Sequence, residues 1–181
     1  MAEKKGIIRR IDDLGRIVIP REYRKLHGIE LGDPIEITAL GTGEIVLKRV
    51  DLGEELVKNA GRILETVSGE LEGALLVSDF ETYLLGEGDG GGRRFMVGKE
   101  IGKWAAKLLK ERNQYLGAAK NERETIDLSG GKFGFAAVLP LMQNGDCYGG
   151  LYYLSHTNIS SETFTTLKIL AKLIALSMKK F

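Results

Sequence analysis

The sequence predicts an α+β protein built from two unlike domains, divided near residue 51. Three observations lead to this prediction. Residues 6–50 alternate short apolar runs with glycine, proline and aspartate turns. Residues 52–181 contain amphipathic helical patterns and two long apolar strands. Positive charge gathers at one end, since residues 1–25 hold eight basic and four acidic side chains, whereas residues 52–181 hold sixteen of each. The predicted domains are therefore 1–51 and 52–181.

Four short strands and one helix are predicted in the first domain. Residues 7–11 and 16–19 are expected to form strands around the turn Asp12-Asp13-Leu14-Gly15. Pro20 presets the backbone for a helix over 21–27, and Gly28 suits the position just after it. Strands 35–38 and 44–50 flank a hairpin loop at 41–43. A segment of about 45 residues rarely folds alone without a disulfide or a metal, so we expect two chains to build one core as a homodimer.

The second domain is predicted to begin with a helix over 52–68, capped by Asp51, and to end with a helix over 161–179. Between them the pattern favours strands at 73–79, 82–85 and 124–128, a glycine-rich loop at 86–92, a helix at 97–111, and strands 133–142 and 148–155 around Asn144-Gly145. Both end helices carry apolar residues at alternating spacings of three and four, which is typical of helix pairs. We therefore expect a second interface and a homotetramer.

Composition excludes several classes of function. The 181 residues have a formal net charge of +1 and 43% hydrophobic residues, so a packed core is expected and a globally basic surface is not. One cysteine, Cys147, excludes an internal disulfide, and only two histidines are present, so no metal or cofactor is expected. The start of the chain is unlike a secretory signal, and no apolar run approaches about 18 residues. We expect a cytoplasmic, nucleoid-associated protein without membrane contact.

The cations at the start of the chain are candidate contacts to a polyanion. They are Arg9, Arg10, Arg16, Arg24 and Lys25. Arginine suits this role because its planar fork can grip a phosphate or the O6/N7 edge of guanine with two hydrogen bonds. The alternative is an ordinary solvated surface, and Asp12, Asp13 and Glu22 dilute the positive field. The pattern favours double-stranded DNA as the partner.

The run GIIRRIDDLGRIVIPREYRKLHGIELGDPIEI resembles the AbrB-type DNA-binding domain over about residues 5–50. The resemblance implies a swapped-hairpin dimer in which interleaved strands form one small β-barrel. It also implies DNA contacts from Arg9, Arg10, Arg16 and Arg24, with Lys25 standing where the family often has arginine. A related branch of the same fold comprises toxin-neutralising antitoxins. An antitoxin-like protein that binds a toxin through its C-terminal half is therefore the alternative to a transcriptional regulator.

The run FAAVLPLMQNGDCYGGLYYLS resembles the closing hairpin of a GAF-type domain, which implies an antiparallel sheet with flanking helices. The pairing of the two domains resembles a transcriptional regulator of spore-forming bacteria. Residues 52–181 would then be a sensor or oligomerisation domain, and a passive oligomerisation role is the alternative to sensing. Five aromatic residues are candidates to line a pocket for an unidentified small ligand, or else to fill the core: Trp104, Phe133, Phe135, Tyr152 and Tyr153.

Enzymatic interpretations have little support in the sequence. Gly86, Gly88 and Gly91 match G-x-G-x-x-G, but Glu87 and Asp89 would repel a phosphate, so a plain loop is favoured. Cys147 and His156 bracket a predicted strand, roughly 30 Å apart if extended, which is too far for a nucleophile and its base. We therefore expect a protein that is not an enzyme.

Overall fold

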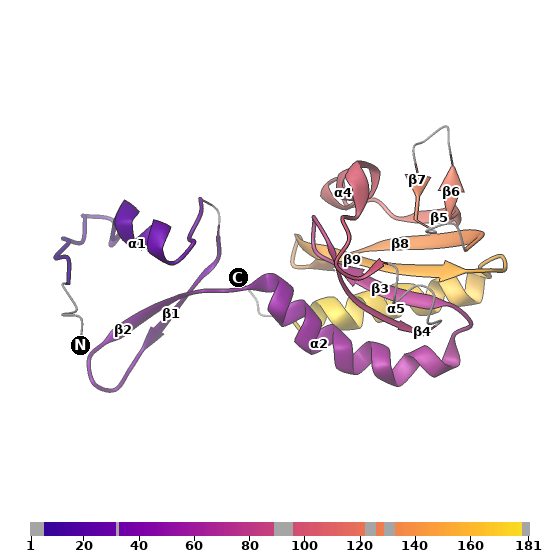
Figure 1. The fold of residues 1–181 in the computed structure, drawn as a ribbon. Helices are drawn as coiled ribbons and strands as arrows, with labels where there is room; N and C mark the ends of the chain where they lie inside the picture. Colours follow the sequence, from indigo (N-terminus) through magenta and orange to yellow (C-terminus); the bar gives the residue numbers. More distant parts are fainter. Residues whose placement is uncertain (1–5, 32, 89–95, 122–125, 129–132, 179–181) are drawn as a thin grey trace. The chain divides into compact units, whose positions relative to one another are not determined.

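The computed structural model describes residues 6–31, 33–88, 96–121, 126–128 and 133–178. The chain separates into two compact units, Met1–Val50 and Asp51–Phe181 (Figure 1). Both units contain helices and strands, which confirms the α+β fold class.

The N-terminal unit contains one short helix and one hairpin. Helix α1 spans Arg21–Leu26, and strands β1 (Ile35–Ala39) and β2 (Ile45–Arg49) pair antiparallel. Pro20 precedes α1 with φ −56°, and Gly28 follows it with φ +59°, a conformation that glycine adopts without strain. These three elements confirm the predictions for 21–27, 35–38 and 44–50.

The strands predicted at 7–11 and 16–19 are not formed within this chain. The turn between them is present, with Gly15 at φ +75° and its N–H donating to the Asp12 carbonyl over 2.9 Å. The flanking segments lack a neighbouring strand among the described residues, so their backbone groups have no ladder to join. Their apolar side chains are also exposed, Ile8 by 90% and Val18 by 73%. The pattern of strand residues is real, but one chain does not complete the sheet.

The C-terminal unit is built on a five-stranded antiparallel sheet in the order β4-β3-β9-β8-β5. Its strands are β3 (Ala74–Ser78), β4 (Tyr83–Gly88), β5 (Tyr115–Ala118), β8 (Phe135–Gln143) and β9 (Asp146–Ser155). A small separate pair joins β6 (Lys120–Asn121) to β7 (Ile126–Asp127). The β8–β9 turn places Asn144 at φ 51° and Gly145 at φ 95°, as the Asn-Gly signal predicted.

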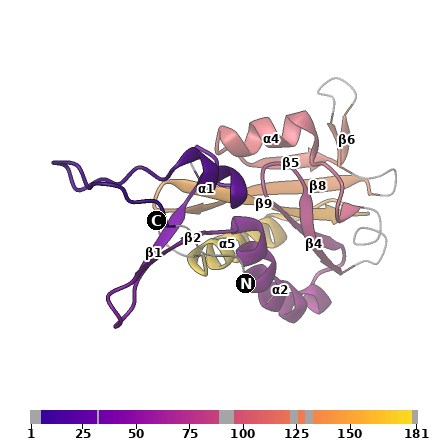
Figure 2. The ribbon, with the colours of Figure 1, turned by 60° about the vertical axis from the view of Figure 1, so that its left-hand side comes forward.

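Helices cover both faces of this sheet. Helices α2 (Leu52–Val67) and α5 (Ser161–Leu176) lie on one face, and α4 (Gly102–Lys110) lies on the other (Figures 1 and 2). A single turn of 3₁₀ helix, η1 (Ser68–Glu70), follows α2. The predicted cap of α2 is formed, since Asp51 accepts from the Glu54 N–H, and α5 is capped by Ser160, which accepts from the Thr163 N–H. No helix among the described residues is both long and apolar enough to cross a membrane.

Two of the predicted elements need correction. The helix expected over 97–111 begins only at Gly102, because Gly98 and Gly102 both have positive φ, at +84° and +77°, and a turn precedes the helix. The glycine-rich loop expected at 86–92 begins later, since Gly86 and Gly88 belong to β4. Residues 89–92 lie outside the described part of the chain.

Gly149 sits where β9 passes closest to β3. Its φ is +142°, and a Cβ at this position would collide with the Ser78 carbonyl oxygen. Only a residue without a side chain fits here, so the register of β9 on β3 depends on glycine at this point.

Candidate nucleic-acid interface

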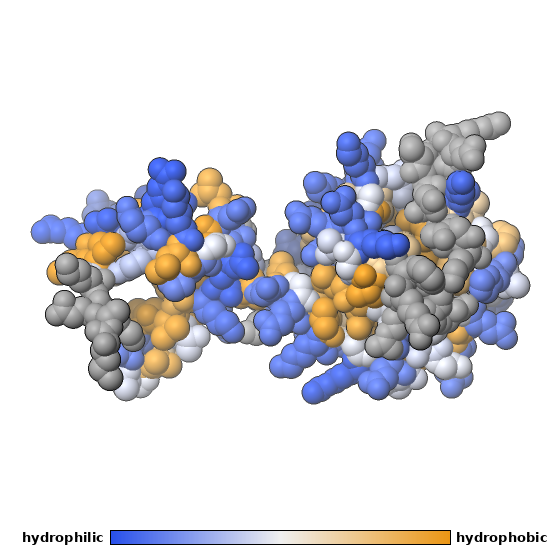
Figure 3. Space-filling view, viewed as in Figure 1, coloured by the Kyte–Doolittle hydropathy of each residue, from blue (hydrophilic) through white to orange (hydrophobic). Residues whose placement is uncertain are grey.

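All five predicted DNA contacts lie on the N-terminal unit. Arg9 and Arg10 precede the Asp12–Gly15 turn, Arg16 follows it, and Arg24 and Lys25 occupy the last turn of α1. Arg24 is half-buried and the other four side chains are exposed. Figure 3 shows hydrophilic and apolar side chains side by side on the surface of this unit. Lys4 and Lys5, which flank the cluster in the sequence, lie outside the described residues.

Most of these cations have no acidic partner. Within the described residues, no ion pair engages Arg9, Arg10, Arg24 or Lys25. Arg49 behaves differently, because its Nη1 donates to the Gly28 carbonyl over 2.9 Å and lies 3.6 Å from the Asp33 carboxylate. Arg49 thus ties β2 to the segment after α1, whereas these four cations remain available to an external anion.

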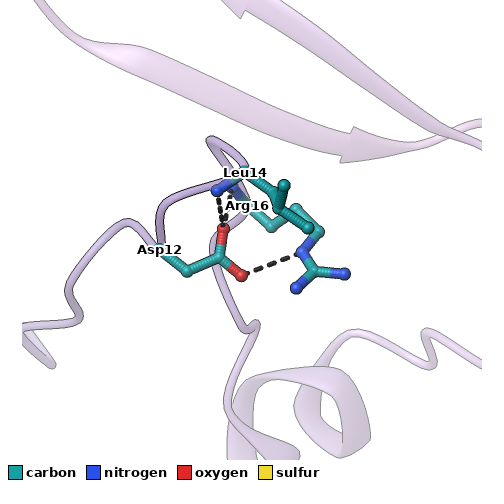
Figure 4. A network of polar contacts seen from close by, with 3 residues as sticks. All are labelled: Asp12, Leu14 and Arg16. Atoms are coloured by element: carbon teal, nitrogen blue, oxygen red, sulfur yellow. Dashed lines mark hydrogen bonds and ion pairs between the residues drawn. The ribbon is translucent and has the colours of Figure 1, made fainter.

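Among the described residues, Arg16 is the one site cation with an acidic partner, Asp12 (Figure 4). The Asp12 Oδ1 accepts from the backbone N–H groups of Leu14 (3.0 Å) and Arg16 (2.8 Å). The Asp12 Oδ2 accepts from the Arg16 Nε over 2.8 Å. The Asp12 N–H in turn donates to the Arg16 carbonyl over 3.0 Å. One aspartate therefore organises both the turn and the side chain that leaves it.

These contacts favour the charged form of the Asp12 carboxyl. The Arg16 backbone N–H, followed by the Arg16 side chain and the Leu14 N–H, lowers the pKa of this group below its ordinary value of 3.8. The sequence suggested Asp12 only as a turn former and a diluting charge. The contact forms because the Asp12 carboxylate lies four residues before Arg16, on the other side of a tight turn. This spacing is visible in the sequence D-D-L-G-R, whose first aspartate is Asp12.

Arg24 and Lys25 also have a local structural role. Both lie in the last turn of α1, where cations interact favourably with the partial negative charge of a helix C-terminus. His27 follows as the C-terminal cap residue, and its N–H donates to the Tyr23 carbonyl over 3.0 Å. Helix stabilisation and DNA contact are compatible roles, since the side chains extend from the helix surface.

The cysteine–histidine pair is not assembled in the C-terminal unit. Cys147 lies at the start of β9, and His156 follows its last residue, so the full length of the strand separates them. Burial is the main cause that raises the pKa of the Cys147 thiol above its ordinary value of 9.0. A raised pKa keeps the thiol protonated at neutral pH, and a protonated thiol is a poor nucleophile.

The glycine motif does not form a phosphate loop over its described part. Gly86 is a buried strand residue paired with Leu76, and Gly91 lies outside the described residues.

The five candidate pocket aromatics do not share one cavity. Phe135 and Tyr153 pack with α2 and α5, whereas Trp104, Phe133 and Tyr152 pack with α4 on the opposite face. Tyr152 is fully buried, its ring meets Tyr83 edge to face at 4.9 Å, and its hydroxyl lies 3.2 Å from the Ser78 Oγ. Alternation along β9 explains the split, because neighbouring residues of a strand point to opposite faces.

Two open hollows are present on the described surface of the C-terminal unit. One, of about 400 Å³, is lined by Ser68, Leu71, Glu72, Gly73, Gly88, His156 and Thr157. The other, of about 270 Å³, is lined by Phe80, Glu81, Thr82, Glu100, Ile101, Gly102, Lys103 and Ala106. None of the five aromatics lines either of these two hollows.

Sequence comparison finds relatives for both units. Residues 8–54 match the family model described as "Antidote-toxin recognition MazE, bacterial antitoxin". Over 160 residues the chain is 29% identical to Stage V sporulation protein T of Bacillus subtilis (strain 168), covering 87% of each chain.

Structural comparison identifies the fold of the larger unit. A type II free methionine-R-sulfoxide reductase from Thermoplasma acidophilum aligns with a TM-score of 0.56 at 14% identity, over 70% of this chain and 94% of that one. The GAF domain region of a protein from Geobacter sulfurreducens PCA aligns with a TM-score of 0.53 at 14% identity, over 68% and 95%. The GAF-B domain of DevS from Mycobacterium smegmatis gives 0.50 at 17%, over 70% and 92%. At these identities the likeness concerns the fold alone.

The chain is thus similar to stage V sporulation protein T over most of its length, with an N-terminal segment that matches the MazE antitoxin model and a C-terminal unit that has the GAF fold.

Proposed function

We propose that this chain is a homo-oligomeric, sequence-specific DNA-binding transcriptional regulator of sporulation genes, acting on the nucleoid in the cytoplasm and without enzymatic activity. The observation that carries the proposal is a set of cations, Arg9, Arg10, Arg24 and Lys25, that have no acidic partner among the described residues and lie on a segment that matches the MazE antitoxin family model. The similarity to stage V sporulation protein T supports the sporulation role.

The chemistry of the cluster suits double-stranded DNA. Guanidinium groups at Arg9, Arg10, Arg16 and Arg24, with the ammonium of Lys25, can neutralise phosphates and donate to base edges in the major groove. A dimer doubles the number of cations. Two symmetric sets of contacts match the symmetry of a palindromic operator.

The experiment that tests DNA binding is a salt titration of affinity. Binding to duplex DNA should weaken steeply with salt, because each neutralised phosphate releases counterions. The Arg9/Arg16/Arg24 triple alanine variant should lose most of this affinity and of its salt dependence. Replacing three exposed cations of the C-terminal unit, Lys58, Arg62 and Lys172, with glutamine provides the control. Equal affinity in the wild type and the triple alanine variant would refute the proposed interface.

We also infer that the N-terminal unit is a swapped-hairpin homodimer. Among its described residues only Pro20 is buried, and Ile8, Ile11, Leu14 and Val18 are exposed by 90, 68, 74 and 73%. A partner chain that pairs with segments 7–11 and 16–19 would bury these side chains and complete the missing strands. The predicted β-barrel then has two chains as its components.

A second interface is proposed on α5. Its Leu167, Ala171 and Ile174 are buried against the sheet, while Ile169, Leu173 and Leu176 are exposed by 56, 51 and 64%. The apolar seam predicted on α2 is largely used within the chain, since Leu56, Ala60 and Leu64 are fully buried. Pairing of α5 with a second copy would combine two dimers into a homotetramer.

The C-terminal unit is proposed to act as a sensor and oligomerisation domain that controls the geometry of the DNA-binding face. Only Val50 and Asp51 separate β2 from α2, and Asp51 already caps the helix. A connection this short transmits orientation, which a flexible tether would not. A small ligand in one of the open hollows would act only if it favoured one subunit pairing over another.

The test of this coupling is an insertion of ten flexible residues after Asp51. We expect a changed preference for the spacing between operator half-sites. Unchanged affinity and spacing preference would leave the unit as a passive oligomerisation module.

The second candidate function is that of an antitoxin-like protein, favoured by the description of the matching family model. The toxin would bind the C-terminal half, although that half forms a folded unit with two packed cores. Gene deletion separates the candidates. Loss of an antitoxin should be lethal unless its toxin gene is removed as well, whereas loss of a regulator should change transcript levels without that dependence.

A further inference from the structure

The contact between Asp12 and Arg16 has a defined polarity. Asp12 binds Arg16 through Nε alone, on the side of the guanidinium nearest the main chain. The Oδ1 of the same carboxylate is engaged by two backbone N–H groups, those of Leu14 and Arg16. The side chain of Arg16 is therefore fastened to the turn it leaves, and the fastening uses residues of one chain only.

The far end of the guanidinium stays open. Within the described part of the chain, no hydrogen bond or ion pair occupies the two Nη groups of Arg16, and 70% of the side chain is exposed. Guanidinium carries five N–H donors in a fixed fork. With Nε engaged, the four donors on Nη1 and Nη2 remain, in the geometry that binds two acceptors in one plane.

We propose that Asp12 is a specificity-determining positioning residue, which holds Arg16 by Nε so that its paired Nη groups are presented to the O6/N7 edge of a guanine. The inference rests on the proposed DNA-binding function and adds a division of labour among its cations. Arg16 reads a base, while the cations without acidic partners supply phosphate contacts.

Charge supports this division. The Asp12 carboxylate offsets the positive charge of Arg16, so the pair attracts the phosphate backbone less than a lone arginine does. The directional hydrogen bonds of the Nη groups persist. A guanidinium whose charge is largely offset binds most favourably to two hydrogen-bond acceptors in its own plane, and only weakly to the diffuse charge of the phosphate backbone. Arg9 and Arg10, which have no such partner among the described residues, are suited to the opposite task.

The experiment uses the full-length protein and a random-sequence duplex library. Selection with the wild type provides its preferred site, and affinities are then measured for that site and for a shuffled duplex at one salt concentration. The Asp12→Asn variant keeps an oxygen for the two backbone N–H groups but removes the charge and the acceptor for Nε. Asp13→Asn, a neighbour with the same change in charge, is the matched control.

We expect Asp12→Asn to reduce the ratio of specific to shuffled affinity about fivefold or more, the range expected for one bidentate base contact. Its affinity for the shuffled duplex should stay equal or rise, because a negative charge is lost. Asp13→Asn should raise affinity for both duplexes alike and keep the ratio. If Asp12 only stabilised the fold, Asp12→Asn would instead weaken binding to both duplexes, and the helix content measured by circular dichroism would also fall.

A double substitution distinguishes coupling from coincidence. Arg16→Lys keeps the charge and removes the fork, so it should lower the ratio as Asp12→Asn does. The Asp12→Asn/Arg16→Lys variant should show no further loss. An unchanged ratio in Asp12→Asn, or losses that multiply in the double variant, would overturn the inference. Absence of DNA binding by the wild type would instead overturn the proposed function itself.

Discussion

The two units of this chain treat their apolar residues in opposite ways. In the unit Asp51–Phe181, Leu56 and Leu75 are fully buried in the core on one face of the sheet, and Leu76 is fully buried in the core on the other face. In the unit Met1–Val50, Ile8, Leu31 and Leu26 are exposed by 90, 93 and 74%. The unit Asp51–Phe181 buries its apolar side chains within a single chain. The unit Met1–Val50 has the sequence pattern of strands, but its described aliphatic side chains are not buried.

This difference in burial bears on whether each unit can fold as a single chain. Burying an aliphatic side chain stabilises a fold by about 1.5–3 kcal/mol, so a unit that leaves its aliphatic residues in water has little to offset its conformational entropy. The larger unit needs no second chain for folding, and its exposed apolar residues on α5 are few. On the proposed dimer, the smaller unit would gain this burial only from a second chain.

The largest expected effect concerns the isolated N-terminal segment. A 1–51 fragment should sediment as a dimer and lose its structure on dilution, because folding and association are one process for such a core. Analytical ultracentrifugation combined with circular dichroism over a concentration series measures this. A fragment that stays folded as a monomer contradicts the comparison.

A pair of alanine substitutions sharpens the comparison. Leu56→Ala removes a fully buried side chain and should cost about 2–5 kcal/mol of unfolding free energy. Ile8→Ala removes a side chain that is 90% exposed in one chain, for which a surface residue predicts less than about 0.5 kcal/mol. We expect a loss clearly above that value, dependent on protein concentration, because the dimer buries Ile8. Urea denaturation at two concentrations provides the measurement.

A charge on α5 tests the second interface. Leu173→Lys places an ammonium in the exposed apolar stripe and should convert tetramers into dimers in light scattering. Thermal stability of the C-terminal unit should change little, since the side chain is 51% exposed. Lys172→Leu, at an exposed position one residue away, should leave the assembly intact.

A smaller effect is expected on the pH dependence of the stability of the C-terminal unit. Burial raises the pKa of Tyr152 above its ordinary value of 10.0, and that of Cys147 above 9.0. The folded state then holds protons that the unfolded state releases, so this stability is present below about pH 9 and is lost as pH rises. At pH 10.5 Tyr152 should account for about 1 kcal/mol. Urea midpoints at pH 7.5 and 10.5 measure the loss, and Tyr152→Phe should reduce it.

The pKa of Asp12 is shifted downward, unlike those of Tyr152 and Cys147. Its pKa lies below 3.8, so the carboxylate stays charged from neutral pH down to about pH 5, and discrimination between duplexes should be constant over this range. A loss of discrimination already at pH 6 would contradict the assigned contact.

Much of the fold was accessible from the sequence because it depends on local signals. Asp51 as a cap, Asn144-Gly145 as a turn, and Pro20 before α1 each act within a few residues, and all three were predicted correctly. The prediction errors concern segments whose secondary structure depends on partners that are distant in the sequence or absent from the single chain. Strand β5 follows Arg112, whose φ is 60°, and is short, so no periodicity reveals it. The strands predicted at 7–11 and 16–19 are not formed in the single chain, and the proposed dimer would supply their partners.

The candidate interface was predictable in composition and less so in geometry. Counting charges is enough to identify Arg9, Arg10, Arg16, Arg24 and Lys25 as a group. The separate treatment of Arg16 depends on the 2.8 Å contact between its Nε and Asp12, which requires coordinates. The split of Phe135 and Tyr153 from Tyr152 depends likewise on knowing which face of the sheet each residue joins.

The close approach of β9 to β3 at Gly149 has a consequence for how this sequence can drift. Every single-nucleotide change that replaces glycine introduces a side chain or stops translation, and each side chain would meet the Ser78 carbonyl. Gly134, by contrast, has room, since the nearest atom to an added Cβ is the His156 carbonyl at 3.5 Å. In a saturation library selected for folded protein, position 149 should therefore return glycine alone, while position 134, just before β8, should return alanine and serine as well.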